Sequence, residues 1–116
     1  MEAIVEVSLQ GPDELRADID ATIDTGFAGQ LALPRFVIDQ FGLRFELSSH
    51  AQLADGSVIA VDYFRGTIAW DGESREVQIL SAETDPLIGT ALLSGYRVTI
   101  DMAPDGNVAV ERLMPG

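Results

Sequence analysis

One carboxylate in this chain lies in a setting that suits acid–base chemistry: Asp24, in the motif Asp24-Thr25-Gly26. The preceding residues, Leu15 to Ile23, alternate between apolar side chains at odd positions and polar side chains at even positions. This period of two is typical of a strand with one buried face. The pattern therefore predicts a carboxylate at the end of a strand, in a tight glycine turn followed by mostly apolar residues.

Two carboxylates that share one proton can hydrolyse an amide without a metal ion or a nucleophilic side chain. The ionised carboxylate takes a proton from water as general base, while the protonated one donates to the carbonyl oxygen. Like charges about 3 Å apart cannot both ionise, so such a pair holds one proton over a wide pH range. This chain carries one motif of that type. A homodimer whose two-fold axis crosses the site supplies the second carboxylate.

The tripeptide alone has a second interpretation, because Asp, Thr and Gly also favour hairpin and Asx turns for local reasons. From average residue usage, Asp followed by Ser or Thr and then Gly occurs by chance in roughly one chain in twenty of this length. The position of Asp24 after a patterned strand, and before apolar residues and a helix, favours a functional role.

A mostly β structure with two short helices is expected to position Asp24. Runs with a period of two, separated by turn residues such as Asp55-Gly56 and Asp71-Gly72, predict hairpins. Pro34 and Gly42 stand where a helix begins and ends. The expected strands are Ile4–Leu9, Leu15–Ile23, Glu46–Ala54, Val58–Trp70 with a break near Gly66, Arg75–Leu80, Arg97–Asp101 and Val108–Arg112, and the expected helices are Pro34–Phe41 and Thr90–Leu93.

Length and composition limit the class of protein. At 116 residues, with 47% hydrophobic and 22% charged residues, the chain is expected to form one soluble globular domain over residues 1–116. Nineteen acidic residues against seven arginines leave a formal charge of −12, which argues against nucleic acid and anionic membranes as partners. No apolar run approaches the ~18 residues of a membrane span. The start lacks the basic and apolar regions of a signal peptide, so a cytoplasmic protein is expected.

Other catalytic or metal-binding arrangements find little support. The chain has no cysteine, so neither a disulfide nor a thiolate site is possible. His50 is the only histidine, and a metal site around it would need three carboxylates with no recognisable spacing. No serine stands in a nucleophile elbow. Trp70 and Tyr63 alternate with apolar residues, which favours packing over ligand stacking. No metal and no cofactor are expected.

Three segments together resemble the retropepsin-like (clan AA) aspartic peptidases, over roughly Ile4 to Glu111. They are Ile23-Asp24-Thr25-Gly26, then Leu53-Ala54-Asp55-Gly56-Ser57, then Leu87-Ile88-Gly89 followed by Thr90-Ala91-Leu92-Leu93. They look like the catalytic loop, the tip of the flap that closes over substrate, and the segment that supports the loop. Their order and spacing agree, so the joint match is more specific than any single motif. The stretch Asp24 to Gly29 with Leu33-Pro34 looks most like the bacterial and archaeal members.

This resemblance implies a closed β-barrel, the half of an acid protease, with a flap hairpin and one or two short helices. Asp24 would be the catalytic carboxylate, Thr25 would hydrogen-bond across the dimer axis, and Gly26 would let the backbone approach substrate. Gly89 and Ile88 would pack behind the loop. The residues implied to contact substrate are Phe27, Ala28, Ala54, Asp55, Gly56, Ser57 and Ile88.

The chain departs from the retroviral members at three positions. It has Phe27 where they carry a small residue, Ala28 where they carry aspartate, and Thr90 where they carry arginine. In that group the aspartate and the arginine interact near the dimer interface, so their joint loss is coherent, whereas the loss of one would strand a charge. Dimer contacts are then expected elsewhere, such as at the termini. Phe27 is expected to narrow the substrate pockets.

The sequence thus predicts a homodimeric aspartic endopeptidase that cleaves peptide or protein substrates with a water activated by one Asp24 from each protomer. A second hypothesis is a catalytically inactive dimerisation or peptide-binding module on the same fold, because fold does not establish function. A third is an unrelated barrel of six or seven strands in which the turn reads Asp-Thr-Gly by chance.

Overall fold

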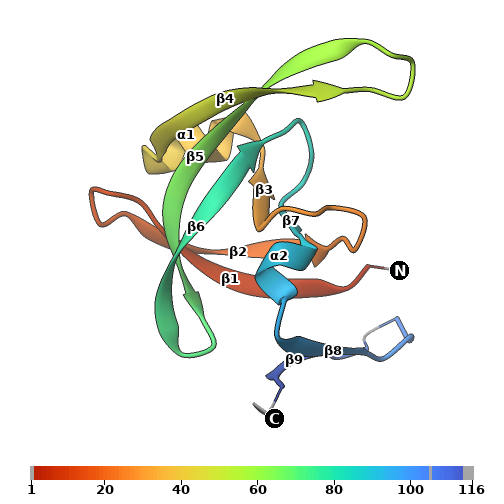
Figure 1. The fold of residues 1–116 in the computed structure, drawn as a ribbon. Coiled ribbons are helices and arrows are strands. Elements are labelled where there is room, and N and C mark those ends of the chain that lie inside the picture. Colours follow the sequence, from red (N-terminus) through yellow and green to blue (C-terminus); the bar gives the residue numbers. More distant parts are fainter. Residues whose placement is uncertain (1, 105, 114–116) are drawn as a thin grey trace.

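Six strands close into a barrel in the computed structural model, which describes residues 2–104 and 106–113 (Figure 1). The expected mostly β fold with two short helices is confirmed. The elements in chain order are β1 (Ile4–Gln10), β2 (Arg16–Ile23), β3 (Leu31–Leu33), α1 (Arg35–Phe41), β4 (Arg44–Gln52), β5 (Val58–Trp70), β6 (Glu73–Ser81), β7 (Leu87–Ile88), α2 (Thr90–Leu93), β8 (Tyr96–Ile100) and β9 (Val108–Arg112).

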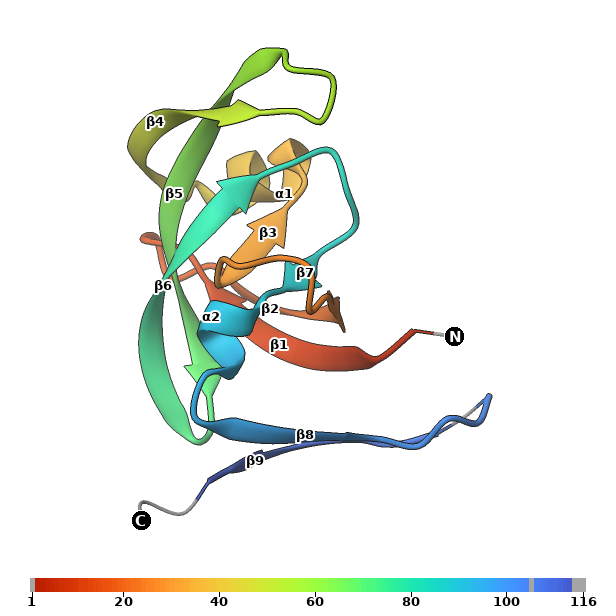
Figure 2. The ribbon, with the colours of Figure 1, turned by 45° about the vertical axis from the view of Figure 1, so that its right-hand side comes forward.

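The strand order around the barrel is β1-β2-β7-β3-β6-β5, and β5 returns to pair with β1 at Ser8–Gln10. Two of these pairings, β2 with β7 and β3 with β6, are parallel, and the others are antiparallel. β4 pairs with β5 alone. The first part of β5 therefore extends out of the barrel and forms a hairpin with β4. We call this hairpin, with its loop 53–57, the flap; it projects beyond the barrel in both views (Figures 1 and 2).

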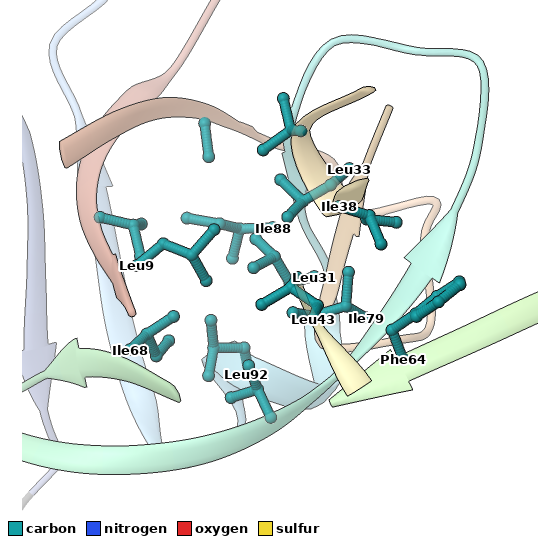
Figure 3. Close-up of a cluster of buried hydrophobic side chains, with 14 of the residues drawn as sticks. Leu9, Leu31, Leu33, Ile38, Leu43, Phe64, Ile68, Ile79, Ile88 and Leu92 are labelled. Atoms are coloured by element: carbon teal, nitrogen blue, oxygen red, sulfur yellow. The ribbon is translucent and has the colours of Figure 1, made fainter. Parts of the chain in front are cut away.

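Apolar side chains from every barrel strand fill the interior (Figure 3). Alternate residues of β1 and β5 point inward, as a period of two requires. Leu9, Leu31, Ile79, Ile88 and Leu92 are completely buried. Because β7 contributes Ile88 to this core, the residues on either side of it are held firmly at the barrel wall.

The predicted break in the long strand near Gly66 is wrong, because β5 runs unbroken from Val58 to Trp70. A Cβ atom at position 66 would lie 2.9 Å from Ile79 Cδ1 and 3.2 Å from Leu43 Cδ2. Glycine is therefore needed at this point for close packing over the core, and it does not interrupt the strand.

The alternating run before Asp24 forms the expected strand, but its apolar face is covered only near its end. In β2, Ala21 is buried, whereas Leu15 just before the strand is 47% exposed. The three-residue strand β3 was not expected, although all its residues are buried. The expected hairpin at the end of the chain is β8–β9, a separate two-stranded sheet.

Candidate active site

Asp24 directly follows β2, and its backbone is fixed by the neighbouring parallel strand. Ile23 pairs with Ile88 of β7, and the Asp24 N–H donates to the Ile88 carbonyl at 2.9 Å. The carboxylate thus stands at the point where the chain leaves the barrel wall, as the alternating pattern predicted. We call residues 24–30, which lead from here to β3, the Asp24 loop.

The Asp24 carboxylate is oriented by its own turn. Its Oδ1 accepts a hydrogen bond from the Gly26 N–H at 2.8 Å, and its backbone carbonyl accepts one from the Phe27 N–H at 3.1 Å. Asp24 is partly exposed, whereas Thr25 and Gly26 are exposed. Within the described part of the chain, Oδ2 accepts no hydrogen bond from another residue. One oxygen is therefore held in place and the other remains available for chemistry.

The junction of β7 and α2 supports the Asp24 loop from behind. The Thr90 N–H donates to the Phe27 carbonyl at 2.9 Å, and the Ala91 N–H donates to the Gly29 carbonyl at 3.1 Å. A Cβ atom at position 89 would lie 2.1 Å from the Gly29 carbonyl oxygen. Only glycine at 89 allows the two backbones to approach this closely.

The Phe27 ring lies over two glycines of this support. A Cβ atom at Gly29 would be 2.6 Å from its Cζ, and one at Gly89 would be 2.6 Å from its Cδ2. The side chain is partly buried, and the ring takes up space that the two glycines leave empty. Phe27 therefore has a packing role in the Asp24 loop, which the sequence did not indicate.

The prediction that Ile88 contacts substrate is wrong for this structure, because its side chain has no exposed surface and belongs to the core. Its neighbour Leu87 is partly exposed. In a β-strand successive side chains point to opposite faces, so burial of Ile88 turns Leu87 outward. The other position expected on this side, Ala28, is exposed on the loop.

The remaining residues expected to contact substrate, Ala54, Asp55, Gly56 and Ser57, form the exposed tip of the flap. Asp55 Oδ1 accepts hydrogen bonds from the Ser57 hydroxyl at 2.6 Å and the Ser57 N–H at 2.9 Å. These bonds lower the pKa of Asp55, since they favour its charged form. Gly56 has φ +88°, a conformation that favours glycine. The flap projects toward the side of the barrel on which β2 ends (Figures 1 and 2).

Three side chains that the sequence did not single out hold the base of the flap. Arg35 of α1 forms an ion pair with Asp62 of β5 at 3.4 Å, and its guanidinium lies 5.0 Å from the centre of the Phe64 ring. Ser48 of β4 donates its hydroxyl to Asp62 at 2.5 Å. Arg35 and Asp62 are 27 positions apart, so no local pattern could have revealed their contact.

A second polar contact ties β4 to β5 and β6 near the same place. Glu46 accepts hydrogen bonds from the Gln78 amide at 2.7 Å and from Arg65. These hydrogen bonds lower the pKa of Glu46, and the one from the Gln78 amide has the larger effect. The flap is thus anchored on both sides at its base while its tip extends away from the barrel.

The other residues considered from the sequence lie on β4 and β5. His50 is exposed on β4, Trp70 is buried in the core, and Tyr63 is partly buried on β5. Among the described residues, no three His, Cys, Asp or Glu side chains gather as ligands of a metal ion would. In that same part of the chain, neither helix has the length and apolar character needed to cross a membrane.

The fold is that of a retropepsin, the barrel of retroviral aspartic proteases. The EIAV protease, solved in complex with the inhibitor HBY-793, is similar to this chain with a TM-score of 0.62. The similarity covers 80% of this chain and 86% of that chain, at 14% sequence identity. At such low identity the likeness concerns the fold alone. No family model and no curated protein matches the sequence.

Proposed function

We propose that the chain is one half of a homodimeric aspartic endopeptidase. The observation that carries this proposal is the Asp24 carboxylate on a barrel of retropepsin fold: Gly26 holds its Oδ1, and no other described residue donates a hydrogen bond to its Oδ2. A single carboxylate is half of the pair that amide hydrolysis requires. A second copy of the chain, related by a two-fold axis beside Asp24, completes it.

The reaction needs one proton shared between two copies of Asp24. The ionised carboxylate accepts a proton from a water molecule as the water oxygen attacks the scissile carbonyl carbon. The protonated carboxylate donates its proton to the carbonyl oxygen, which gives a tetrahedral diol. Collapse of the diol breaks the C–N bond: the Asp24 carboxyl that holds a proton donates it to the leaving amine, and the ionised Asp24 accepts the proton of a diol hydroxyl, which restores the one shared proton.

The other expected roles fit the positions of the residues. Thr25 is exposed next to Asp24, where its hydroxyl reaches a partner loop. Gly26 is exposed and leaves its backbone open to an extended peptide. The flap tip, from Ala54 to Ser57, lies over the bound peptide and excludes bulk water, which strengthens the electrostatic interactions inside. Phe27 limits the size of side chains accepted beside the loop.

The test is cleavage of a mixture of unfolded peptides between pH 3 and pH 7, read by mass spectrometry. Asp24→Asn removes the shared proton and the general base, so we expect cleavage to fall by about 10³-fold or more. Asp20→Asn is the matched control, because Asp20 is an exposed carboxylate on β2, the strand that leads to Asp24. It should retain wild-type activity.

Full activity of Asp24→Asn, with its fold verified by circular dichroism, would rule out this mechanism. Wild-type protein that binds peptides and cuts none at any pH would instead favour the non-catalytic binding module. A hydroxyl-bearing mimic of the tetrahedral diol should inhibit the wild type and bind Asp24→Asn more weakly.

A further inference from the structure

Strand β5 changes its neighbour part of the way along one edge, while β6 pairs along the other edge. Over the first part of β5 the changing edge pairs with β4, as far as the pair of Arg65 with Arg44. From Thr67, which pairs with Gln10, the same edge pairs with β1 instead. Gly66 lies between the two pairings. A crevice therefore opens on β5 between the end of β1 and the start of β4.

This crevice is a hollow of about 250 Å³ on the outside of the barrel. Residues 10–12 line it from β1 and the turn that follows, Arg44 lines it from β4, residues 65–67 line it from β5, and Glu76 lines it from β6. Ile68 of β5 is buried in the core, so its neighbour Thr67 points outward. The lining is therefore polar and carries charges of both signs.

Two arginines contribute positive charge to the crevice. Arg44 and Arg65 are direct cross-strand partners, so their side chains lie on the same face of the hairpin. Like charges directly opposite each other destabilise a strand pair. Arg65 is balanced by Glu46 and, at 3.8 Å, by Glu76. Arg44 forms no ion pair with any carboxylate among the described residues, so its charge is not balanced within the crevice.

The other polar side chains of the crevice add hydrogen-bond donors. Gln10 Oε1 accepts a hydrogen bond from Arg16 at 2.9 Å, which leaves the Gln10 amide nitrogen to donate elsewhere. The Thr67 hydroxyl can donate as well. Gln10 and Thr67 also line an adjoining hollow of about 100 Å³, which Arg16 lines too. Three of the seven arginines of this acidic chain therefore lie along one outer surface.

We infer that the crevice binds a carboxylate group, with Arg44 as its main contact. A planar guanidinium donates two parallel hydrogen bonds to a carboxylate, and Gln10 and Thr67 supply further donors. A singly charged group is favoured over phosphate, because Glu76 lines the same crevice and Arg65 already serves two carboxylates. A small organic acid and an acidic side chain of a peptide share this chemistry.

The crevice is separate from the Asp24 loop, so this inference does not rest on the proposed function. β2 begins at Arg16, beside the crevice, and ends at Ile23, just before Asp24. A strand of eight residues spans about 23 Å. The β1–β2 turn and the Asp24 loop lie on opposite sides of the barrel in Figure 1. A ligand in the crevice therefore leaves the Asp24 carboxylate uncovered.

Occupation of the crevice affects the base of the flap. Arg44 begins β4, and its cross-strand partner Arg65 donates a hydrogen bond to Glu46 in the same hairpin. A bound carboxylate neutralises Arg44 and so removes its repulsion with Arg65. Because only the folded chain brings β1, β4 and β5 together around the crevice, a ligand bound there also raises the melting temperature.

Sodium butyrate and the acetylated, amidated tripeptide Gly-Glu-Gly test the inference, since each carries one carboxylate. Each is added at pH 7 to the ¹⁵N-labelled protein, and amide shifts are followed by NMR. We expect saturable shifts centred on Gly11, Gly66 and Thr67. The matched tripeptide Gly-Gln-Gly, which has no charge, should cause no such shifts. Failure of both carboxylates to give saturable shifts at these amides would overturn the inference.

Arg44→Gln removes the charge and the planar pair of donors. We expect the dissociation constant of either carboxylate to rise about tenfold or more. Arg97→Gln is the matched control, since Arg97 is an exposed arginine on β8, outside the crevice. It should bind like the wild type. Unchanged affinity in Arg44→Gln, with its fold verified by the spectrum of the free protein, would overturn the inference.

Melting temperatures provide a second measurement that does not depend on assigned spectra. Butyrate or the Gly-Glu-Gly tripeptide should raise the melting temperature of the wild type and of Arg97→Gln, and should raise that of Arg44→Gln much less. An equal rise in all three proteins would overturn the inference, because the ligand would then act without Arg44.

The same titrations identify the source of the carboxylate. Tighter binding of butyrate supports a small organic acid, and tighter binding of the tripeptide supports an acidic side chain of a peptide. Tighter binding of inorganic phosphate than of either would overturn the assignment to a carboxylate. A wild-type protein that cleaves peptides and binds neither carboxylate in the crevice would overturn this inference and leave the proposed function intact.

Discussion

Asp24 and Asp55 each accept a hydrogen bond from the backbone N–H two residues further along the chain. The distances are 2.8 Å from Gly26 and 2.9 Å from Ser57. The two turns differ in what surrounds them. The Asp24 loop is hydrogen-bonded to Ile88 behind it. The flap tip has hydrogen bonds only among its own residues 53–57, as far as the described residues show, and it is exposed throughout.

The barrel wall therefore holds Asp24 in place, whereas Asp55 is held only within its own turn. Asp55 Oδ1 accepts hydrogen bonds from two donors of Ser57, so this carboxylate stabilises its own turn. Asp24 keeps Oδ2 free of other described residues, while the barrel wall holds its backbone in place. Positioned groups on rigid elements are what catalysis requires, and mobile loops are what substrate entry requires. Under the proposed function, the same local turn therefore serves two different purposes in one site.

The largest expected contrast lies between the two carboxylates. Asp55→Asn keeps an acceptor oxygen for Ser57 and should reduce peptide cleavage by less than about tenfold, against the loss of about 10³-fold expected for Asp24→Asn. Parallel measurements of kcat/KM on one peptide test this prediction. Equal losses for the two variants would mean that Asp55 takes part in the chemistry and would break the comparison.

Glycines of the two regions should respond to alanine in different ways. Gly89→Ala forces a Cβ atom against the Gly29 carbonyl oxygen, so we expect the free energy of unfolding to fall by about 3 kcal/mol. Gly56→Ala meets no atom within 4 Å and suffers only from φ +88°, at a cost of about 1 kcal/mol. Urea unfolding measures both values. A larger loss for Gly56→Ala would show that the flap tip is the more tightly constrained turn.

The smallest effect concerns the pH at which the flap tip loosens. The pKa of Asp55 is lowered from 3.8, so its stabilisation of the turn is complete above that value and is lost as pH falls through the lowered pKa. Ser57→Ala removes the hydroxyl that contributes most to the shift. The pKa of Asp55 should then rise, and loosening should begin at higher pH.

Carboxyl ¹³C chemical shifts of Asp55, followed during acid titration, measure this change. Ser49→Ala is the matched control, since Ser49 is an exposed serine on β4 of the same flap. It should leave the titration of Asp55 unchanged. An unchanged titration in Ser57→Ala would mean that the backbone N–H alone orders the flap tip.

Local patterns predicted most of the strands and the place of Asp24. The alternation before Asp24 fixed the end of β2, and Asp55-Gly56 marked the turn of the flap. The three-residue strand β3 was not predicted, because a short, fully buried run shows no alternation of apolar and polar residues. Gly66 was misread because the close packing that requires glycine there comes from Leu43 and Ile79, which lie elsewhere in the chain.

The site was harder to predict than the strands, since its contacts join distant segments. The motif identified Asp24, but the packing of Phe27 on Gly89 and the burial of Ile88 depend on the parallel pairing of β2 with β7. The anchor between Arg35 and Asp62 depends on where α1 lies beneath the flap. Contacts between distant segments produce no periodic pattern in the sequence.

The pairing of β2 with β7 also sets when the site can form during synthesis. Thr90, which bonds to Phe27, is 63 positions further along the chain. At 5 to 20 residues per second, a ribosome needs about 3 to 13 s to cover that distance. Non-local contacts of this kind cannot form before both partners have emerged. A growing chain therefore carries the complete Asp24-Thr25-Gly26 motif for several seconds without the support that orders its loop, and a chain ended before Thr90 would never gain it.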